Sequence, residues 1–364
     1  MKKQTIVVKI GSSSLTNEKG EIDEDKLTGY VEAITALRKA NHTVVLVSSG
    51  AVAAGFKQLG YPFRPETIKG RQAAAAVGQS LLIQSYIKKF QEHQLIPAQI
   101  LLTRSDFSNR ERYRNAFSTI MELLDRGIIP IINENDTVSV DELTFGDNDM
   151  LSALVSGFIH ADQLIILTDI NGLYTDNPMK NPNAKKYNFL EEITDDILAA
   201  ASSDGSKLGT GGMKSKLEAA KTALSLGVSV FIGKGEGKDS LLQVLQGTGD
   251  GTYITNKSLE AINTSRQWIA LHSESFGKIY VDQGAEEAIL YKGRSLLPAG
   301  IVEVEGTFEK GDVVEVYVTK GLLGKGEVNY SSGEVKQEMK KKMEQKKFKP
   351  SIEVIHRNHW VEIK

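Results

Sequence analysis

Residues 128–169 read IIPIINENDTVSVDELTFGDNDMLSALVSGFIHADQLIILTD, and the pattern within this stretch points to the fold. Two apolar runs, Ile128–Ile132 and Gln163–Leu167, predict strands buried on both faces, as in a parallel sheet. Between them, Gly146-Asp147-Asn148-Asp149 opens an apolar segment that predicts a helix ending near His160. The stretch therefore indicates a strand–helix–strand unit.

Polar residues gather where these two strands end. The first strand is followed by Asn133-Glu134-Asn135-Asp136, and the second by Thr168-Asp169. The start of the helix, with Asp149, should face the same edge. Ligands of open parallel sheets bind at the carboxyl ends of the strands. Single residues of these types also serve as turn residues and helix caps, but five or six converging at one edge favour a ligand site.

The alternation of strands and helices extends from residue 1 to about residue 256, which we take as one domain. The other predicted elements are strand Thr5–Ile10, helix Asp25–Ala40, strand Thr43–Val47, helix 71–90, strand Ala98–Leu102, helix Asn109–Arg126, a helix from near Met213 and strand Val228–Ile232. This order predicts a three-layer α/β/α sandwich with a mainly parallel sheet.

The residue pattern of the sequence changes after Gly247. Glycine, threonine and asparagine at residues 249–256 indicate the start of a connector, which should continue over residues 257–275. Short alternating runs between glycines then predict a small β-rich domain over residues 276–364. That domain should also contain a charged helix over residues 334–347 and a closing strand over residues 351–363.

Composition excludes several classes of protein. With 364 residues and a net charge of −2, the chain is long enough for two domains and has no global attraction to nucleic acid or membranes. It has no cysteine, which excludes disulfides and thiolate metal sites and fits a reducing compartment. Lys9 interrupts the N-terminal apolar run too early for a signal peptide, and no apolar stretch approaches the roughly 20 residues of a spanning helix. We therefore expect a cytoplasmic protein.

Two segments could bind an anion. Lys9 lies inside an apolar strand, where its charge is costly unless it is paired, although an edge strand would let the ammonium reach water. Gly11 and Ser12 follow that strand and would suit phosphate oxygens. The glycine-rich segment Leu208–Lys216 leads into a helix and matches neither a Walker A loop nor a dinucleotide-binding fingerprint. Its alternative interpretation is a flexible loop, but a basic first turn opposes the helix dipole and so favours a bound anion.

Metal ligands are less clear from the sequence. Asp147, Asp149 and Asp169 are candidates for contact with Mg²⁺, but phosphates and water supply most ligands of this ion in nucleotide sites. We therefore leave the direct protein ligand open. His356 and His359 have metal-ligand spacing, and we interpret them as surface residues.

Taken in order, the motifs resemble the amino acid kinase family, over residues 1 to about 256. The segments that carry this resemblance are Val8–Ser13, Val47–Ala51, Ile132–Asp136, Gly146–Asp149, Leu167–Tyr174 and Gly209–Met213. They most resemble the members of the family that act on glutamate. In addition, Ile279–Gly284 and Ser295–Gly300 resemble the PUA domain that many bacterial members carry.

The resemblance implies phosphorylation of the γ-carboxylate of L-glutamate with ATP and Mg²⁺, as the first step of proline synthesis. It implies that Lys9 and Lys216 stabilise the transferring phosphoryl group and that Asp149 orients both lysines. The implied glutamate-binding residues are Ser49, Gly50, Asp136 and Asn148. The implied nucleotide-binding residues are Lys9, Gly11, Ser12, Thr168, Asp169, Thr210, Gly211, Gly212, Met213, Lys214, Ser215 and Lys216, with the role of Lys214 left open.

The resemblance also implies partners. These are L-proline as a feedback inhibitor, a hand-off of the product to glutamate-5-semialdehyde dehydrogenase, and other copies of the chain in a dimer or tetramer. No membrane partner is expected.

The chemistry fits the residues independently of the resemblance. A glutamate carboxylate has a pKa of about 4.3, so it is already ionised at neutral pH and needs no general base. The difficulty is that an anion must attack an anionic phosphoryl group, so cations and positioning do most of the work.

Two alternatives stay open. One is a kinase of the same fold that acts on aspartate, N-acetylglutamate or a nucleoside monophosphate. The other is an RNA-binding protein that uses its C-terminal domain, since PUA domains often contact RNA. A stripe of lysines would serve that role: Lys336, Lys340, Lys341, Lys342, Lys346 and Lys347. A solvated helix face is the favoured interpretation of that stripe.

Overall fold

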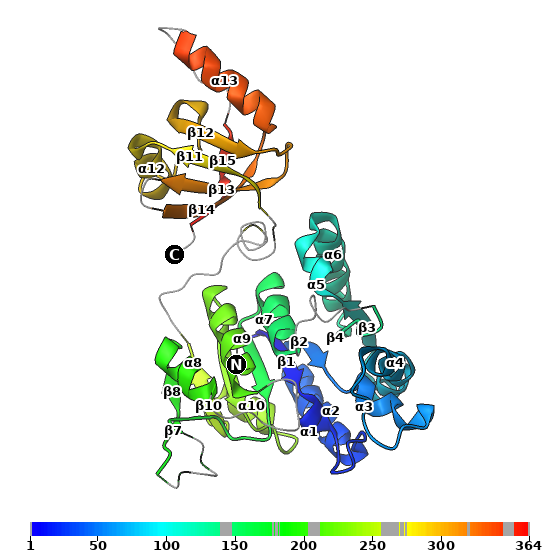
Figure 1. Ribbon diagram of the computed structural model, residues 1–364. Coiled ribbons are helices and arrows are strands. Elements are labelled where there is room, and N and C mark those ends of the chain that lie inside the picture. Colours follow the sequence, from blue (N-terminus) through cyan, green and yellow to red (C-terminus); the bar gives the residue numbers. More distant parts are fainter. Residues whose placement is uncertain are drawn as a thin grey trace. The chain divides into compact units, whose positions relative to one another are not determined.

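The computed structural model of the chain describes residues 2–138, 148–176, 178, 181, 183–202, 212–255, 269, 273, 275–318, 321–344 and 353–362. The chain divides into two compact units (Figure 1). The first unit comprises Met1–Asp106 and Arg114–Ala261, and the second comprises Phe107–Tyr113 and Ile262–Lys364. The second unit thus includes a short segment from the first third of the chain.

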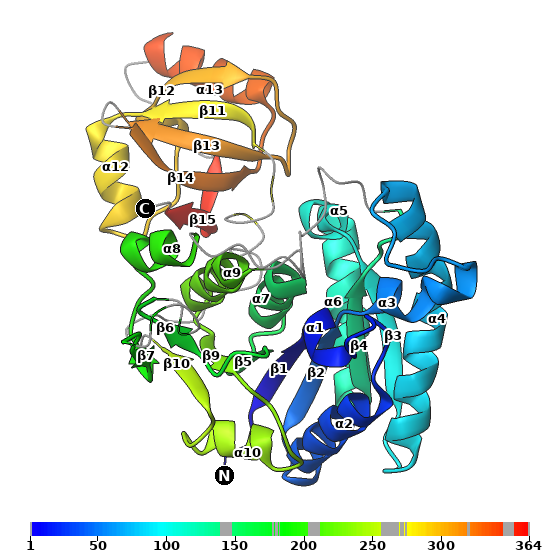
Figure 2. The same cartoon turned by 60° about the horizontal axis from the view of Figure 1, so that its bottom comes forward.

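An eight-stranded sheet organises the first unit, with the order β3-β4-β2-β1-β5-β9-β10-β8. Figure 2 shows β3, β4, β2 and β1 side by side. Neighbouring strands from β3 to β9 run parallel, and β10 runs antiparallel to β9. The strands are β1 (Thr5–Ile10), β2 (Thr43–Ser48), β3 (Pro97–Leu102), β4 (Ile129–Glu134), β5 (Gln163–Leu167), β8 (Phe189–Leu190), β9 (Ser229–Gly233) and β10 (Gly251–Ile254). The predicted α/β class with a mainly parallel sheet is confirmed.

Helices cover both faces of this sheet. The helices α2, α4 and α10 contribute to one continuous core with the strands, while α7 and α9 pack together and contact β1, β5 and β9. The helices are α1 (Ser12–Leu15), α2 (Glu24–Lys39), α3 (Ala51–Gly55), α4 (Ile68–Gln91), α5 (Arg104–Ser108), α6 (Arg110–Asp125), α7 (Asn148–Phe158), α8 (Asp195–Ser202), α9 (Met213–Ser225) and α10 (Ser240–Leu245), with the short 3₁₀ helix η1 (Lys57–Leu59). Throughout the described part of the chain, no helix combines the length and apolar character needed to cross a bilayer.

Strand β1 determines which layer Lys9 faces, because neighbours along a strand point to opposite sides of the sheet. Ile6, Val8 and Ile10 belong to the core that α2 and α4 cover. Lys9 therefore points to the opposite face, where α7 contacts β1. Since β1 is paired on both sides, with β2 and β5, the alternative of an edge strand at Lys9 is excluded.

The second unit contains a five-stranded sheet with the order β12-β11-β13-β14-β15, which confirms the predicted β-rich domain. Its elements are β11 (Ser275–Val281), α12 (Gln283–Leu290), η2 (Pro298–Gly300), β12 (Ile301–Gly306), β13 (Val313–Val318), β14 (Gly321–Val328), α13 (Ser332–Glu344) and β15 (Ile355–Glu362). Its own apolar core includes Ile279, Val314 and Val316. The sequence did not indicate α12, which begins at the N-cap Asp282.

Some local predictions were wrong. Gly251–Ile254 forms β10 inside the main sheet and is not part of a connector. Its glycine is needed for packing, because a Cβ at residue 251 would overlap the ring of Phe231 on the neighbouring strand. After Asp169, where no strand was predicted, β6 (Leu173–Tyr174) and β7 (Lys186–Tyr187) form a two-stranded antiparallel sheet.

Candidate functional site

The candidate site lies at the carboxyl end of the parallel sheet. The order β4-β2-β1-β5 places the ends of four strands side by side, and each is followed by a polar segment that the sequence had marked. The chain leaves β1 toward β2 on one side, whereas β5 lies on the other side of β1. Such a switch point is where doubly wound sheets open a crevice for ligands.

Three charged side chains meet beside the end of β1. The Lys9 ammonium forms an ion pair with Asp149 Oδ1, and Lys216 Nζ lies 3.0 Å from Asp149 Oδ2. Asp149 is fully buried, and Lys9 and Lys216 are 2% and 9% exposed. The structure therefore brings together the three residues predicted for catalysis, although they lie far apart in the sequence.

Two helix starts position this cluster. Asp149 occupies the first turn of α7, where the helix dipole stabilises a carboxylate. Lys216 occupies the first turn of α9, which has no acidic residue and no side-chain cap at Gly212. Ser215 connects the two helices, since its Oγ lies 3.1 Å from Asp149 Oδ2 and 2.9 Å from the Gly212 carbonyl oxygen. An uncapped N-terminus with basic residues is suited to an anion.

A second cluster joins the ends of β2 and β4 to α7. Asn148 Nδ2 lies within hydrogen-bond distance of three acceptors, which are the Ser48 carbonyl oxygen at 2.8 Å, Ser49 Oγ at 3.0 Å and Asn133 Oδ1 at 2.7 Å. Gly50 follows with φ of 110°, a backbone conformation that favours glycine. Ser49, Gly50 and Asn148, all predicted to bind substrate, are thus neighbours.

Asp136 follows β4 and carries a perturbed carboxyl group. The pKa of Asp136 is raised from its ordinary value of 3.8 to about 6, chiefly by burial and also by the nearby Glu134 carboxylate, while the Arg71 guanidinium lowers it in part. A half-buried carboxylate in this state gains from a cationic ligand, which would stabilise its ionised form. The site therefore offers an anionic group that suits an ammonium.

The described residues predicted to bind nucleotide come from β1 and the segment after it, from the segment after β5, and from the start of α9. Gly11 sits beside Lys9, since a Cβ there would come within 3.4 Å of Lys9 Nζ. Thr168 is buried, and its hydroxyl donates a hydrogen bond of 3.0 Å to Asp169 Oδ1. Lys214 is exposed and lies 3.8 Å from Glu218, one turn along α9. Ser12 begins the short helix α1.

Several predicted residues lie outside the described part of the chain. These are Asp147, Thr210 and Gly211, together with Lys346 and Lys347 of the lysine stripe. Among the described residues, no group of three histidine or carboxylate side chains could hold a metal ion.

Sequence reasoning assigned no role to two residues that contact this site. Asn133 belongs to a quoted motif, and Gln79 comes from α4, 54 positions earlier in the chain. Asn133 Nδ2 donates a hydrogen bond of 2.7 Å to Gln79 Oε1, and both side chains are buried. The sequence signal that could have indicated Gln79 was its polar side chain within a helix, α4, that is rich in alanine and leucine.

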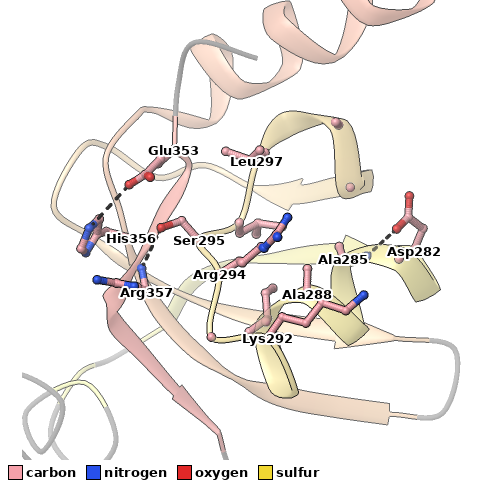
Figure 3. Close-up of a pocket in the computed structure, with 16 residues that line it drawn as sticks. Asp282, Ala285, Ala288, Lys292, Arg294, Ser295, Leu297, Glu353, His356 and Arg357 are labelled. Carbon is pink, nitrogen blue, oxygen red and sulfur yellow. Dashed lines mark hydrogen bonds and ion pairs between the residues drawn. The ribbon is translucent and has the colours of Figure 1, made fainter. Parts of the chain in front are cut away.

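The second unit contains a separate pocket of about 800 Å³ (Figure 3). Lys292, Arg294 and Arg357 line it together with Asp282 and Glu353, so its charges are mixed. Glu353 lies 3.7 Å from His356 Nε2. The lining contains none of the residues predicted for catalysis.

Comparison with protein families agrees with this geometry. The model of the amino acid kinase family matches residues 4–234, and the model of the PUA domain matches residues 277–348. The chain belongs to the amino acid kinase family and carries a PUA domain. A carbamate kinase from Giardia lamblia bound to AMP-PNP shares the fold, with a TM-score of 0.51 and 20% identity over 70% of this chain and 99% of that chain.

Relatives along the whole length are more specific. The chain is 64% identical to glutamate 5-kinase 1 of Bacillus licheniformis and 63% identical to glutamate 5-kinase 1 of Bacillus subtilis. Both alignments span 364 residues and cover all of each protein.

Proposed function

We propose that this chain transfers the γ-phosphoryl group of ATP to the γ-carboxylate of L-glutamate, which gives L-glutamyl 5-phosphate, the first intermediate of proline biosynthesis. The buried cluster of Lys9, Asp149 and Lys216 is the observation that carries this proposal. Two ammonium groups and one carboxylate sum to one positive charge, which a bound anion would stabilise at low local dielectric. Full-length similarity to glutamate 5-kinases supports the choice of acceptor.

The two lysines would lower the barrier by electrostatics. The attacking carboxylate and the phosphoryl group are both anionic, so cations held in place before the reaction stabilise the charge of the transition state. Asp149 holds both ammonium groups, which keeps them from moving as charge shifts between the oxygens of the phosphoryl group. No proton has to be removed, in agreement with the absence of histidine from this cluster.

ATP and Mg²⁺ fit the residues present. The uncapped start of α9, with Lys214 and Lys216, and the glycine beside Lys9 would hold the phosphates. Mg²⁺ would neutralise phosphate charge when bound. Both oxygens of Asp149 already face a lysine ammonium, so we propose that phosphates and water supply most of the ligands of the ion. Thr168 and Asp169 would contact the nucleoside part.

The second cluster would bind glutamate. Asp136 would pair with the α-ammonium group, and the segment Ser49–Gly50 together with Asn148 would also contact the amino acid. This arrangement would place the γ-carboxylate toward Lys9, since β1 and β2 are neighbouring strands.

We predict that kcat/KM for L-glutamate falls about tenfold for each pH unit below about 6. The reason is that the pKa of Asp136 is raised to about 6, so the carboxyl group loses its charge below that pH and no longer attracts an ammonium. Steady-state kinetics between pH 5 and pH 8 would check this. A profile that is flat through pH 6 for glutamate, or the same profile in Asp136→Asn, would contradict the role of Asp136.

An acceptor panel tests the proposed function. The purified chain is incubated with ATP and Mg²⁺ and with L-glutamate, L-aspartate, N-acetyl-L-glutamate or a nucleoside monophosphate, and ADP release is followed. We expect rapid turnover with L-glutamate alone. Turnover with another acceptor in preference to L-glutamate would replace the proposed substrate and leave the phosphotransfer site in place.

We predict that a shortened chain ending at Asn256 folds and keeps the glutamate kinase activity. All the residues proposed for catalysis precede Val228, and the second unit has its own core. The one early segment assigned to the second unit, Phe107–Tyr113, contains no proposed site residue. Circular dichroism and turnover would be measured. A folded but inactive shortened chain would mean that the second unit completes the active site.

The remaining partners are proposals that rest on the resemblance. We propose a cytoplasmic homo-oligomer, a dimer or tetramer, that L-proline inhibits and that passes its product to glutamate-5-semialdehyde dehydrogenase. An RNA-binding role of the second unit is the weaker candidate. Electrophoretic shifts of a structured RNA that disappear with added salt, and that the shortened chain lacks, would revive that role.

A further inference from the structure

The side chain of Gln79 connects α4 to the proposed glutamate site through a chain of amides. Gln79 Oε1 accepts from Asn133 Nδ2 at 2.7 Å, and Asn133 Oδ1 accepts from Asn148 Nδ2 at 2.7 Å. All three side chains are buried, so each amide depends on the next for its hydrogen bonds.

Two backbone groups set the direction of the Asn133 and Asn148 amides. The backbone N–H of Glu134 can only donate, and it donates to Asn133 Oδ1 at 2.9 Å. The backbone carbonyl of Ser48 can only accept, and it accepts from Asn148 Nδ2 at 2.8 Å. Asn133 must therefore turn its Nδ2 toward α4, where it needs an acceptor. Gln79 supplies that acceptor.

The consequence for the substrate lies at Asn148. The Asn148 Nδ2 atom faces three acceptors inside the protein. The Asn148 Oδ1 atom is bonded to the same carbon and therefore points away from these acceptors. Among the described residues, no donor bonds to this oxygen. A free carbonyl oxygen beside Ser49 accepts a hydrogen bond from a substrate N–H but cannot bind a carboxylate.

We propose that Gln79 is a positioning residue that fixes the amide of Asn133 and thereby presents Asn148 Oδ1 as an acceptor for the α-ammonium group of the substrate. The inference rests on the proposed function and adds to it a residue that does not touch the substrate. Asp136 would supply the charge for the ammonium, and Asn148 would supply a directed hydrogen bond.

The test replaces Gln79 by methionine, which keeps the length of the side chain and removes the acceptor. KM for L-glutamate should rise about tenfold, as expected when one hydrogen bond of a bound group is weakened, while KM for ATP stays unchanged. Gln79→Glu keeps an acceptor oxygen and should stay near wild type. Gln84→Met, on the exposed side of the same helix, is the matched control and should change nothing.

Glutarate distinguishes positioning from a general structural role, because it has both carboxylates of glutamate but no ammonium. Gln79→Met should leave kcat/KM for glutarate near the wild-type value, and it should add nothing in an Asn133→Ala background. Equal losses with both substrates, or a rise in KM for ATP, would overturn the proposal.

A double variant covers the case in which Gln79→Met is unstable. If the melting temperature of Gln79→Met is too low for kinetic measurements, the double variant Gln79→Met with Asn133→Leu is used, because it removes both buried hydrogen-bond partners. This double variant should fold and should show the same rise in KM for L-glutamate alone. An unchanged KM in that variant would overturn the role of the amide chain. Wild-type turnover of L-glutamate tests the proposed function separately, and its absence would overturn both proposals.

Discussion

Replacing Lys9 or Lys216 by alanine should lower kcat by about a hundredfold or more, because each substitution removes a cation positioned for the transition state. Both ammonium groups are buried against Asp149 and cannot be replaced by water without losing this arrangement. KM for L-glutamate should change much less than kcat. Steady-state kinetics with each substrate varied in turn would measure both constants.

The control for this prediction is Lys221→Ala. Lys221 lies on the same helix as Lys216, but it is exposed and pairs with Asp195 on the surface. Exposed pairs of this kind contribute about 0–1 kcal/mol, so Lys221→Ala should keep wild-type kcat and nearly the same melting temperature. Near wild-type kcat in both Lys9→Ala and Lys216→Ala would rule out the electrostatic account.

Asp136→Asn should raise KM for L-glutamate by about 30-fold or more and leave KM for ATP nearly unchanged. Removing one partner of a buried charge pair costs about 2–4 kcal/mol, and 2 kcal/mol corresponds to about 30-fold in affinity. An exposed carboxylate, Asp125, provides the matched control. An equal rise in KM for both substrates would mean that Asp136 supports the structure and does not bind the ammonium.

The stability of the same variant separates lost binding from misfolding. Because the pKa of Asp136 is raised in the folded protein, its ionisation costs stability as pH rises from about 3.8 through about 6. Asparagine does not ionise, so Asp136→Asn should melt higher than wild type at pH 8, and this gain should shrink toward pH 4. A variant that binds glutamate poorly yet melts higher has lost a ligand contact and not its fold.

The main elements of the fold follow from local patterns. Apolar runs such as Thr5–Ile10 and Gln163–Leu167 match β1 and β5 residue for residue, because strands buried on both faces carry a strong signal. Strand β10 was not predicted, since its sequence Gly251–Ile254 is only four residues long and follows several glycines. Its place depends on close packing against Phe231, which a sequence pattern does not reveal.

The candidate site was predictable in part. The charge of Lys9 within an apolar strand indicated either a paired charge or an edge strand, and the rule for parallel sheets placed the ligand site at the carboxyl edge. The identity of the partner, Asp149, and its second contact with Lys216 depend on how α7 and α9 pack, and only the family resemblance indicated them. The contact of Gln79 spans 54 positions between two elements, and no local pattern encodes it.

The most direct test of the proposed reaction follows the oxygen atoms. L-glutamate labelled with heavy oxygen in its γ-carboxylate is incubated with the enzyme, ATP and Mg²⁺, and hydroxylamine converts the acyl phosphate to a hydroxamate. Attack by the γ-carboxylate leaves one of its oxygens on phosphorus, so the phosphate released by hydroxylamine should carry one heavy oxygen. Phosphate without heavy oxygen, formed at the rate of ATP consumption, would mean that water and not the γ-carboxylate attacks, and would contradict the account.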